Sequence, residues 1–120
     1  MKPTFVQGLE HTARYTVTKE MSPAHMPTVV LSTPTMVGLI EGTCMQLLGP
    51  HLDDTEISVG THICVSHTGA ATENEEFSIV VRVKEIDRRR VTFESSVLSP
   101  RGSISEGTHQ RAVVDRSRFS

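Results

Sequence analysis

The sequence predicts an α+β fold in which an antiparallel sheet of about five strands wraps around one central helix. One segment with the two-residue alternation of a strand precedes a single apolar helical segment, and four more strand-like segments follow it. Short turns separate the last strands, and strands joined in this way pair antiparallel. With 120 residues, the chain has the length of one ordinary domain, which we expect to span residues 1–120.

The first strand is expected at Glu10–Thr18, where two kinds of side chain alternate along the chain. Its more polar face carries threonine and arginine residues. A loop that contains Pro23 and Pro27 then leads to the helix. Proline lacks an N–H group, so regular hydrogen bonding is interrupted there.

A helix of about four turns is expected within Ser32–Pro50, with a start signal and a stop signal. Ser32 or Thr33 can cap its start, with Pro34 at the first helical position. Gly49 marks its end and Pro50 follows. Because apolar residues occupy every side, we expect a central helix without a solvent-facing side.

Four strands are expected after the helix, and short turns at residues 87–89 and 99–102 join the last three. Their ranges are Val59–His67, Phe77–Ile86, Arg90–Leu98 and Ile104–Val114. In the first of them, simple alternation places Ile63 and His67 on one face and Gly60 on the other.

Glu41 is the one charged residue of the helix, and no lysine or arginine occurs between residues 20 and 81. A carboxylate in such a setting either finds a partner from elsewhere in the fold or takes up a proton. Both outcomes perturb the carboxyl group, which makes Glu41 a candidate acid, base or nucleophile. The structural alternative is a carboxylate at a water-filled cleft that bonds to backbone amides.

His67 and Thr33 are two further polar residues near the helix. If the strand face that carries His67 looks toward the helix, the imidazole comes within reach of Glu41. A histidine at a strand end is more often a structural residue. Thr33 lies about two turns before Glu41, and we expect it to act as the N-cap, although its hydroxyl and the free helix amides can also donate to an oxyanion.

Charge is unevenly distributed, although the net charge of −2 argues against general nucleic-acid binding. Residues 20–81 carry eight acids and no lysine or arginine, whereas residues 82–120 carry nine basic residues and five acids. The basic half therefore suits an anionic ligand. No apolar stretch approaches the roughly 20 residues of a membrane span, so we expect a cytoplasmic protein without membrane contact.

The cysteines and histidines do not show a metal-binding pattern. We expect Cys44 in mid-helix and Cys64 in mid-strand to be small buried hydrophobic residues. Neither has a C-x-x-C partner, and His62 and His67 fall on opposite strand faces. We therefore expect neither a metal site nor an organic cofactor.

Three segments carry motifs with a common order and spacing: Ser32–Glu41, Val59–Thr68 and Glu106–Val113. Together they resemble the hot-dog-fold acyl-CoA thioesterases related to fluoroacetyl-CoA thioesterase. The resemblance covers about residue 30 to the C-terminus. It implies a hot-dog fold and a homodimer, or an oligomer of dimers, with the acyl site between protomers and coenzyme A along the interface.

The resemblance also implies roles for five residues. Thr33, Glu41 and His67 would form the catalytic constellation. Gly60 would lie near the acyl group, and Arg111 would lie near the site. Both would then contribute to substrate binding.

The expected function is hydrolysis of a short or polar acyl-CoA thioester without a metal or organic cofactor. Glu41 would activate water or attack the carbonyl itself, while Thr33 and helix-start amides would hold the oxyanion. His67 would orient the carboxylate or relay a proton. Two alternatives are a non-catalytic acyl-CoA or small-ligand binding module and a hot-dog enoyl-CoA hydratase. The hydratase pattern of Asp and His in one loop segment is absent here.

Overall fold

Five strands and one long helix make up the structure, a computed structural model that describes residues 1–119. The elements in chain order are β1 (Glu10–Thr16), α1 (Thr33–Leu48), β2 (Glu56–Val65), β3 (Glu76–Asp87), β4 (Arg90–Ser99) and β5 (Gly102–Asp115). The predicted α+β class is confirmed. Each predicted strand is present with slightly different ends.

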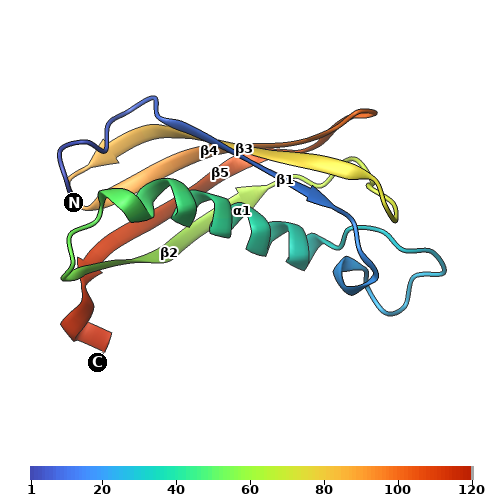
Figure 1. Ribbon diagram of the computed structural model, residues 1–120, viewed down its shortest axis with the longest axis horizontal. Helices are drawn as coiled ribbons and strands as arrows, with labels where there is room; N and C mark the ends of the chain where they lie inside the picture. The colour runs from blue at the N-terminus through green and yellow to red at the C-terminus, as the bar shows by residue number, and fades with distance from the viewer. Residues whose placement is uncertain (120) are drawn as a thin grey trace.

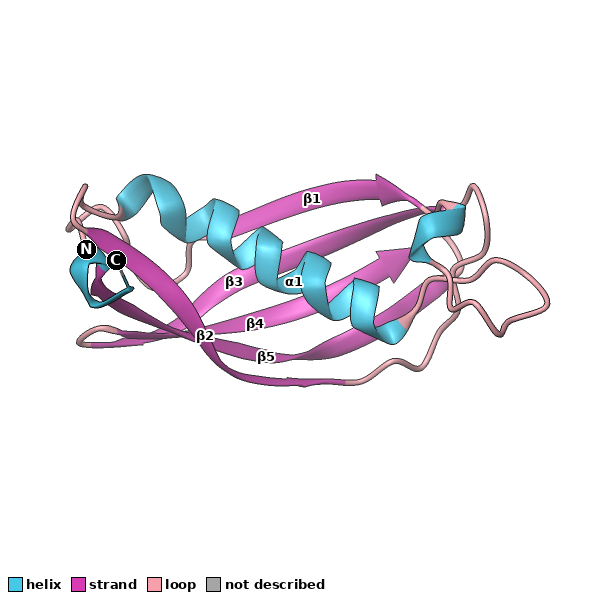
Figure 2. Cartoon of the chain, turned by 90° about the horizontal axis from the view of Figure 1, so that it is seen from below, coloured by secondary structure: helices cyan, strands magenta, loops and turns pink. Residues whose placement is uncertain are grey.

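The strands form one antiparallel sheet in the order β1-β3-β4-β5-β2. β1 and β2 are its two edges, and α1 connects them in the chain. Figure 1 shows α1 running along one face of the sheet. In the view from the helix side, α1 lies between the two edge strands and crosses the sheet obliquely (Figure 2). The helix and the β2 edge are therefore neighbours.

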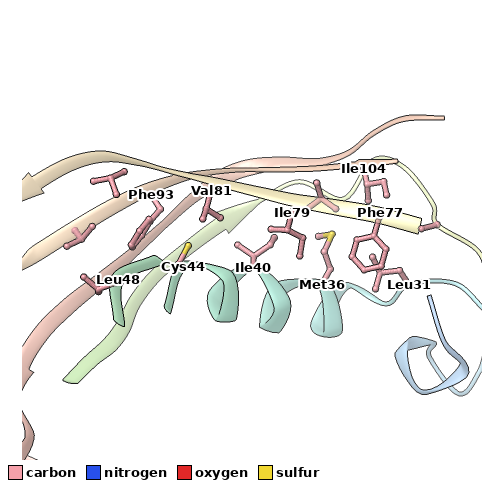
Figure 3. Close-up of a cluster of buried hydrophobic side chains, with 14 of the residues drawn as sticks. Leu31, Met36, Ile40, Cys44, Leu48, Phe77, Ile79, Val81, Phe93 and Ile104 are labelled. Atoms are coloured by element: carbon pink, nitrogen blue, oxygen red, sulfur yellow. The ribbon is translucent and has the colours of Figure 1, made fainter. Parts of the chain in front are cut away.

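The hydrophobic core lies between α1 and the sheet (Figure 3). Side chains spaced four residues apart on α1 point toward the strands, because this spacing keeps them on one helix face. The buried apolar residues of α1 are Met36, Ile40, Cys44 and Leu48, and they face Phe77, Ile79, Val81 and Phe93. Burying each large apolar side chain contributes roughly 1.5–3 kcal/mol.

The two cysteines have different environments. Cys44 is buried, as expected, and burial raises the pKa of its thiol to about 12. Cys64 is exposed, so its predicted burial is wrong. The reason is topological: Cys64 belongs to the edge strand β2, and residues 60–64 of this strand are all exposed.

The ends of α1 differ in detail from the prediction. Ser32 is the N-cap, and its Oγ accepts a hydrogen bond from the Thr35 N–H at 3.2 Å. The prediction that Thr33 caps the helix is therefore wrong, and its hydroxyl is available for another contact. Gly49 has φ −50°, in the right-handed helical region, and the chain continues into a short 3-10 turn.

One side of α1 is exposed, contrary to the prediction that no side faces solvent. Gly38 and Met45 lie on this side, and Met45 is 50% exposed. A Cβ at Gly38 would meet nothing within 4 Å. The apolar character of this side is therefore not explained by packing within the chain.

A buried carboxylate fixes the start of β2. Glu56 is only 7% exposed, and its Oε2 accepts a hydrogen bond at 3.0 Å from Arg89 Nη2. The N-terminal amine is its second charged partner. Arg89 Nε also donates to the Val113 carbonyl at 2.9 Å. These contacts tie the β3–β4 turn to the end of the sheet where β2 begins.

Candidate active site

Three polar side chains from α1 and β5 meet beside Gly60 on β2. A Cβ placed on Gly60 would lie 3.4 Å from each of Glu41 Oε1, Arg111 Nη1 and His109 Cε1. Glu41 is half-buried, whereas Arg111 and His109 are 4% and 1% exposed. Because glycine has no side chain, a small space remains between these groups. We call these four residues the Glu41 cluster.

A break in strand register places Gly60 in this cluster. Gly60 pairs with Arg111 and Ile63 pairs with His109, and the register shifts between residues 60 and 62. Side chains of directly paired residues share a sheet face, so Gly60 and Ile63 both lie on the face that carries Arg111. The prediction that they lie on opposite faces is wrong, because a bulge adds one residue to the alternation.

Arg111 is held by hydrogen bonds on three sides. Its Nε donates to Ser58 Oγ at 2.9 Å, and its Nη2 donates to the Ser58 carbonyl at 3.1 Å. Its Nη1 lies 3.1 Å from His109 Nε2. Burial lowers the pKa of Arg111, and the Glu41 carboxylate opposes this effect by favouring the charged guanidinium. A basic partner from a distant part of the chain thus lies near Glu41.

His109 is a site residue that the sequence analysis did not single out. Its Nδ1 lies 2.8 Å from the His62 carbonyl oxygen, and its ring stacks on Phe93 with centroids 6.4 Å apart. Burial lowers the pKa of His109, and the positive charge of Arg111 adds to this effect. One signal was available: residues two apart in a strand share a face, so a prediction of Arg111 at the site also points to His109.

Thr33 and His67 form a second polar pair. Thr33 Oγ1 and His67 Nδ1 are 2.7 Å apart. His67 lies just after β2, and backbone hydrogen bonds of Ser66 and Thr68 to β5 fix this segment. The expected contact of His67 with Glu41 is replaced by the one with Thr33. We call Thr33 and His67 the Thr33 pair.

The Thr33 pair and the Glu41 cluster lie apart along α1. Eight residues separate Thr33 from Glu41, which corresponds to roughly 12 Å along a helix axis. A single thioester carbonyl is too small to contact both groups at once. The chain therefore presents two separate polar groups along the β2 side of the helix.

The described part of the chain offers no metal centre. Among residues 1–119, no group of three or more His, Cys, Asp or Glu side chains is placed to hold a metal ion. In the same residues, no helix is long and apolar enough to cross a membrane.

Comparison with known proteins identifies the family. The sequence profile of the fluoroacetyl-CoA-specific thioesterase family (FlK) matches residues 5–117. The chain is 32% identical over 116 residues to the fluoroacetyl-CoA thioesterase of Streptantibioticus cattleyicolor, covering 97% of this chain and 83% of that protein.

Solved structures agree with this assignment. The fluoroacetyl-CoA thioesterase FlK has a TM-score of 0.90 and 29% identity, over 96% of this chain and 92% of that one. A variant of FlK bound to fluoroacetate and CoA matches with a TM-score of 0.90 and 28% identity, over 97% of this chain and 100% of that one.

Two more distant structures support the fold. A thioesterase superfamily member from Thermus thermophilus has a TM-score of 0.89 at 21% identity, over 98% of this chain and 89% of that one. A hot-dog-like protein from Thermanaerovibrio acidaminovorans has a TM-score of 0.87 at 19% identity, over 97% of this chain and 94% of that one. The chain has the hot-dog fold, belongs to the fluoroacetyl-CoA-specific thioesterase family and is a thioester hydrolase.

Proposed function

We propose that the protein hydrolyses short acyl-CoA thioesters and that Glu41 acts directly on the thioester. The observation that carries this proposal is the convergence of Glu41, Arg111 and His109 on the space beside Gly60. This space lies next to a carboxylate that makes no hydrogen bond or ion pair with any residue between 1 and 119. A carboxylate in this situation can attack a carbonyl carbon or take a proton from water.

The proposed reaction forms one C–O bond and breaks the C–S bond. In the general-base route, Glu41 takes a proton from water as the water oxygen attacks the carbonyl carbon. In the nucleophilic route, a Glu41 oxygen attacks first, and water then hydrolyses the resulting anhydride. Both routes release the acid and the CoA thiol, and the thiolate regains a proton from solvent or from the partner subunit's His67. The oxyanion would be stabilised by the partner subunit's Thr33 and by the amides that begin its α1, because Thr33 of the same chain lies roughly 12 Å from Glu41 along the helix.

A dimer through the β2 edge would bring the two polar groups together. An edge strand with residues 60–64 exposed is a pairing surface, and a two-fold pairing of β2 with its copy makes α1 and its copy antiparallel. Gly60 lies at one end of this exposed stretch, and His67 lies three residues beyond the other end. The pairing would therefore bring the partner subunit's His67 toward Glu41 and cover the exposed side of α1.

The substrate class follows from the family and from charge. The curated relative is a fluoroacetyl-CoA thioesterase, and one solved relative holds fluoroacetate and CoA. The basic second half of this chain suits the phosphates of coenzyme A. We therefore assign acyl-CoA as the substrate class, with fluoroacetyl-CoA as one member to be tested.

A panel of thioesters tests this function. Acetyl-CoA, fluoroacetyl-CoA, propionyl-CoA and malonyl-CoA would be incubated with the protein, and thiol release followed by a colour reagent. We expect catalytic turnover of at least one. Tight binding of these thioesters without thiol release would instead support a non-catalytic acyl-CoA binding module.

A further inference from the structure

We propose that His109 is a positioning residue for Arg111: as a neutral imidazole with its proton on Nδ1, it accepts a hydrogen bond from the guanidinium and holds it beside Glu41. This inference rests on the proposed function of the Glu41 cluster. It adds a tautomer, a direction of hydrogen bonding and a role for His109, to which the sequence motifs assign none.

The hydrogen-bond partners determine the tautomer. The His62 carbonyl oxygen, 2.8 Å from His109 Nδ1, can only accept, so Nδ1 must carry a proton. The Arg111 Nη1 group, 3.1 Å from Nε2, can only donate, so Nε2 must be unprotonated. Both contacts are satisfied together by one form of the ring. The His62 carbonyl comes from the bulged part of β2, so the bulge also fixes the imidazole.

This arrangement completes the orientation of the guanidinium. Ser58 accepts from Nε and Nη2, and His109 accepts from Nη1. Three of the five guanidinium N–H groups are thus used. Nη1 keeps one further N–H, and Nη1 lies near the space beside Gly60. This N–H can bind Glu41 or the thioester oxygen. Without an acceptor at His109 Nε2, Arg111 Nη1 loses the hydrogen bond that fixes its position.

The charges around the ring favour the neutral form. Burial disfavours the imidazolium, and Arg111 repels it, while the His62 carbonyl and Glu41 favour it. The His62 side chain contributes a smaller repulsion. Protonation of Nε2 would point one N–H group at another and would remove the acceptor that Arg111 uses. Acidification should therefore disorder the guanidinium as well as charge the ring.

Nitrogen NMR of the histidine rings tests the tautomer without any assay of activity. In ¹⁵N-labelled wild-type protein at neutral pH, we expect His109 to show a protonated Nδ1 and an unprotonated Nε2. Histidine in water prefers the opposite tautomer, so the expected pattern is distinctive. A His109 ring with a proton on Nε2, alone or on both nitrogens, would overturn the proposal. This readout holds even if the protein proves inactive on every thioester tested, which would count against the proposed function alone.

Two variants separate the acceptor role from simple packing. In His109→Gln, the amide oxygen can reach the position of Nε2 and accept from Arg111. In His109→Asn, the shorter side chain can still donate to the His62 carbonyl but has no acceptor at that position. We expect the Gln variant to keep kcat within about 10-fold of wild type and the Asn variant to lose about 100-fold, because a displacement of about 1 Å in a reacting group costs that much.

The controls are the same substitutions at His11, a half-buried histidine on β1 that bonds Gln46 and lies outside the Glu41 cluster. His11→Gln and His11→Asn should leave kcat unchanged, and thermal melting should show all four variants folded. Equal activity of folded His109→Gln and His109→Asn would overturn the positioning role. The expected result is a Gln variant that rescues most of the rate and that loses less activity on acidification than wild type, since it lacks the imidazole.

Discussion

Gly60→Ala is the most direct perturbation of the Glu41 cluster, because it adds one methyl group at known distances. The new Cβ would lie 3.4 Å from Glu41 Oε1, Arg111 Nη1 and His109 Cε1. Such a methyl fits if its neighbours move by a few tenths of an ångström. It also fills the space that an attacking water or a thioester oxygen needs. Because the methyl occupies this space itself, the water or thioester oxygen has to shift by about 1 Å, which costs roughly 100-fold, so kcat/KM should fall by about 100-fold or more.

The fold should survive this change. Alanine in a strand gains roughly 0.5–1 kcal/mol over glycine, which offsets the close contacts, so the melting temperature should stay within about 5 °C. Gly49→Ala is the matched control, because a Cβ there meets nothing within 4 Å. Thiol release and thermal melting are measured on both variants. A folded Gly60→Ala protein with wild-type kcat/KM, or an equal loss in Gly49→Ala, would refute the reasoning.

Three further predictions address the Thr33 pair, the β2 edge and the buried carboxylate. Thr33→Val should lower kcat by at least about 10-fold at little cost in stability, whereas Ser32→Ala should lower the unfolding free energy by about 1 kcal/mol through loss of the N-cap. Thiol release measures the first effect and urea titration measures the second. A Thr33→Val protein with full activity would contradict the first expectation. Successive N–H groups of a strand point alternately to its two sides, so either Ile63→Pro or Cys64→Pro removes an N–H donor that points away from β5. For that variant, sedimentation should show less dimer and thiol release should show less turnover. A fully active monomer would exclude the dimer. The N-terminal amine and neighbouring donors hold the pKa of Glu56 at about 2, below its ordinary 4.5, so wild-type stability should fall as the pH drops from about 4.5 toward 2. Urea titration should show a weaker fall in stability for Glu56→Gln over this pH range. The same pH dependence in both proteins would contradict this expectation.

Much of the fold could be predicted because the local patterns are strong. Strand alternation and the capping signals locate α1 and all five strands within a few residues. The exposed side of α1 could not be predicted in this way. An apolar helix face indicates that something covers it, but the sequence does not say whether the cover is the chain's own sheet or a second molecule.

The candidate site was predicted in part. The isolation of Glu41 among apolar residues was visible in the sequence, and the family motifs pointed to Gly60 and Arg111. The bulge after Gly60 was not visible, because alternation alone assumes an unbroken ladder. The sequence alone does not point to His109, because a histidine within a strand looks structural until its neighbour at i+2 is placed in the site.

The role of Thr33 depends on a distant contact. Ser32 and Thr33 are both good capping residues, and local sequence does not choose between them. In the structure Ser32 caps α1, and Thr33 contacts His67, which is 34 residues away in the chain. Tertiary packing of the segment after β2 therefore decides which hydroxyl caps the helix and which one faces the histidine.

The rate of thioester hydrolysis by Glu41→Gln tests the central claim most directly. Gln keeps the shape of the side chain but is neither a base nor a nucleophile, so kcat should fall by about 100-fold to 10,000-fold in a protein that melts at the wild-type temperature. The measurement uses whichever acyl-CoA the wild-type protein hydrolyses fastest, followed by thiol release under saturating substrate. A folded Glu41→Gln protein with an unchanged kcat would contradict the account, because catalysis would then not involve this carboxylate.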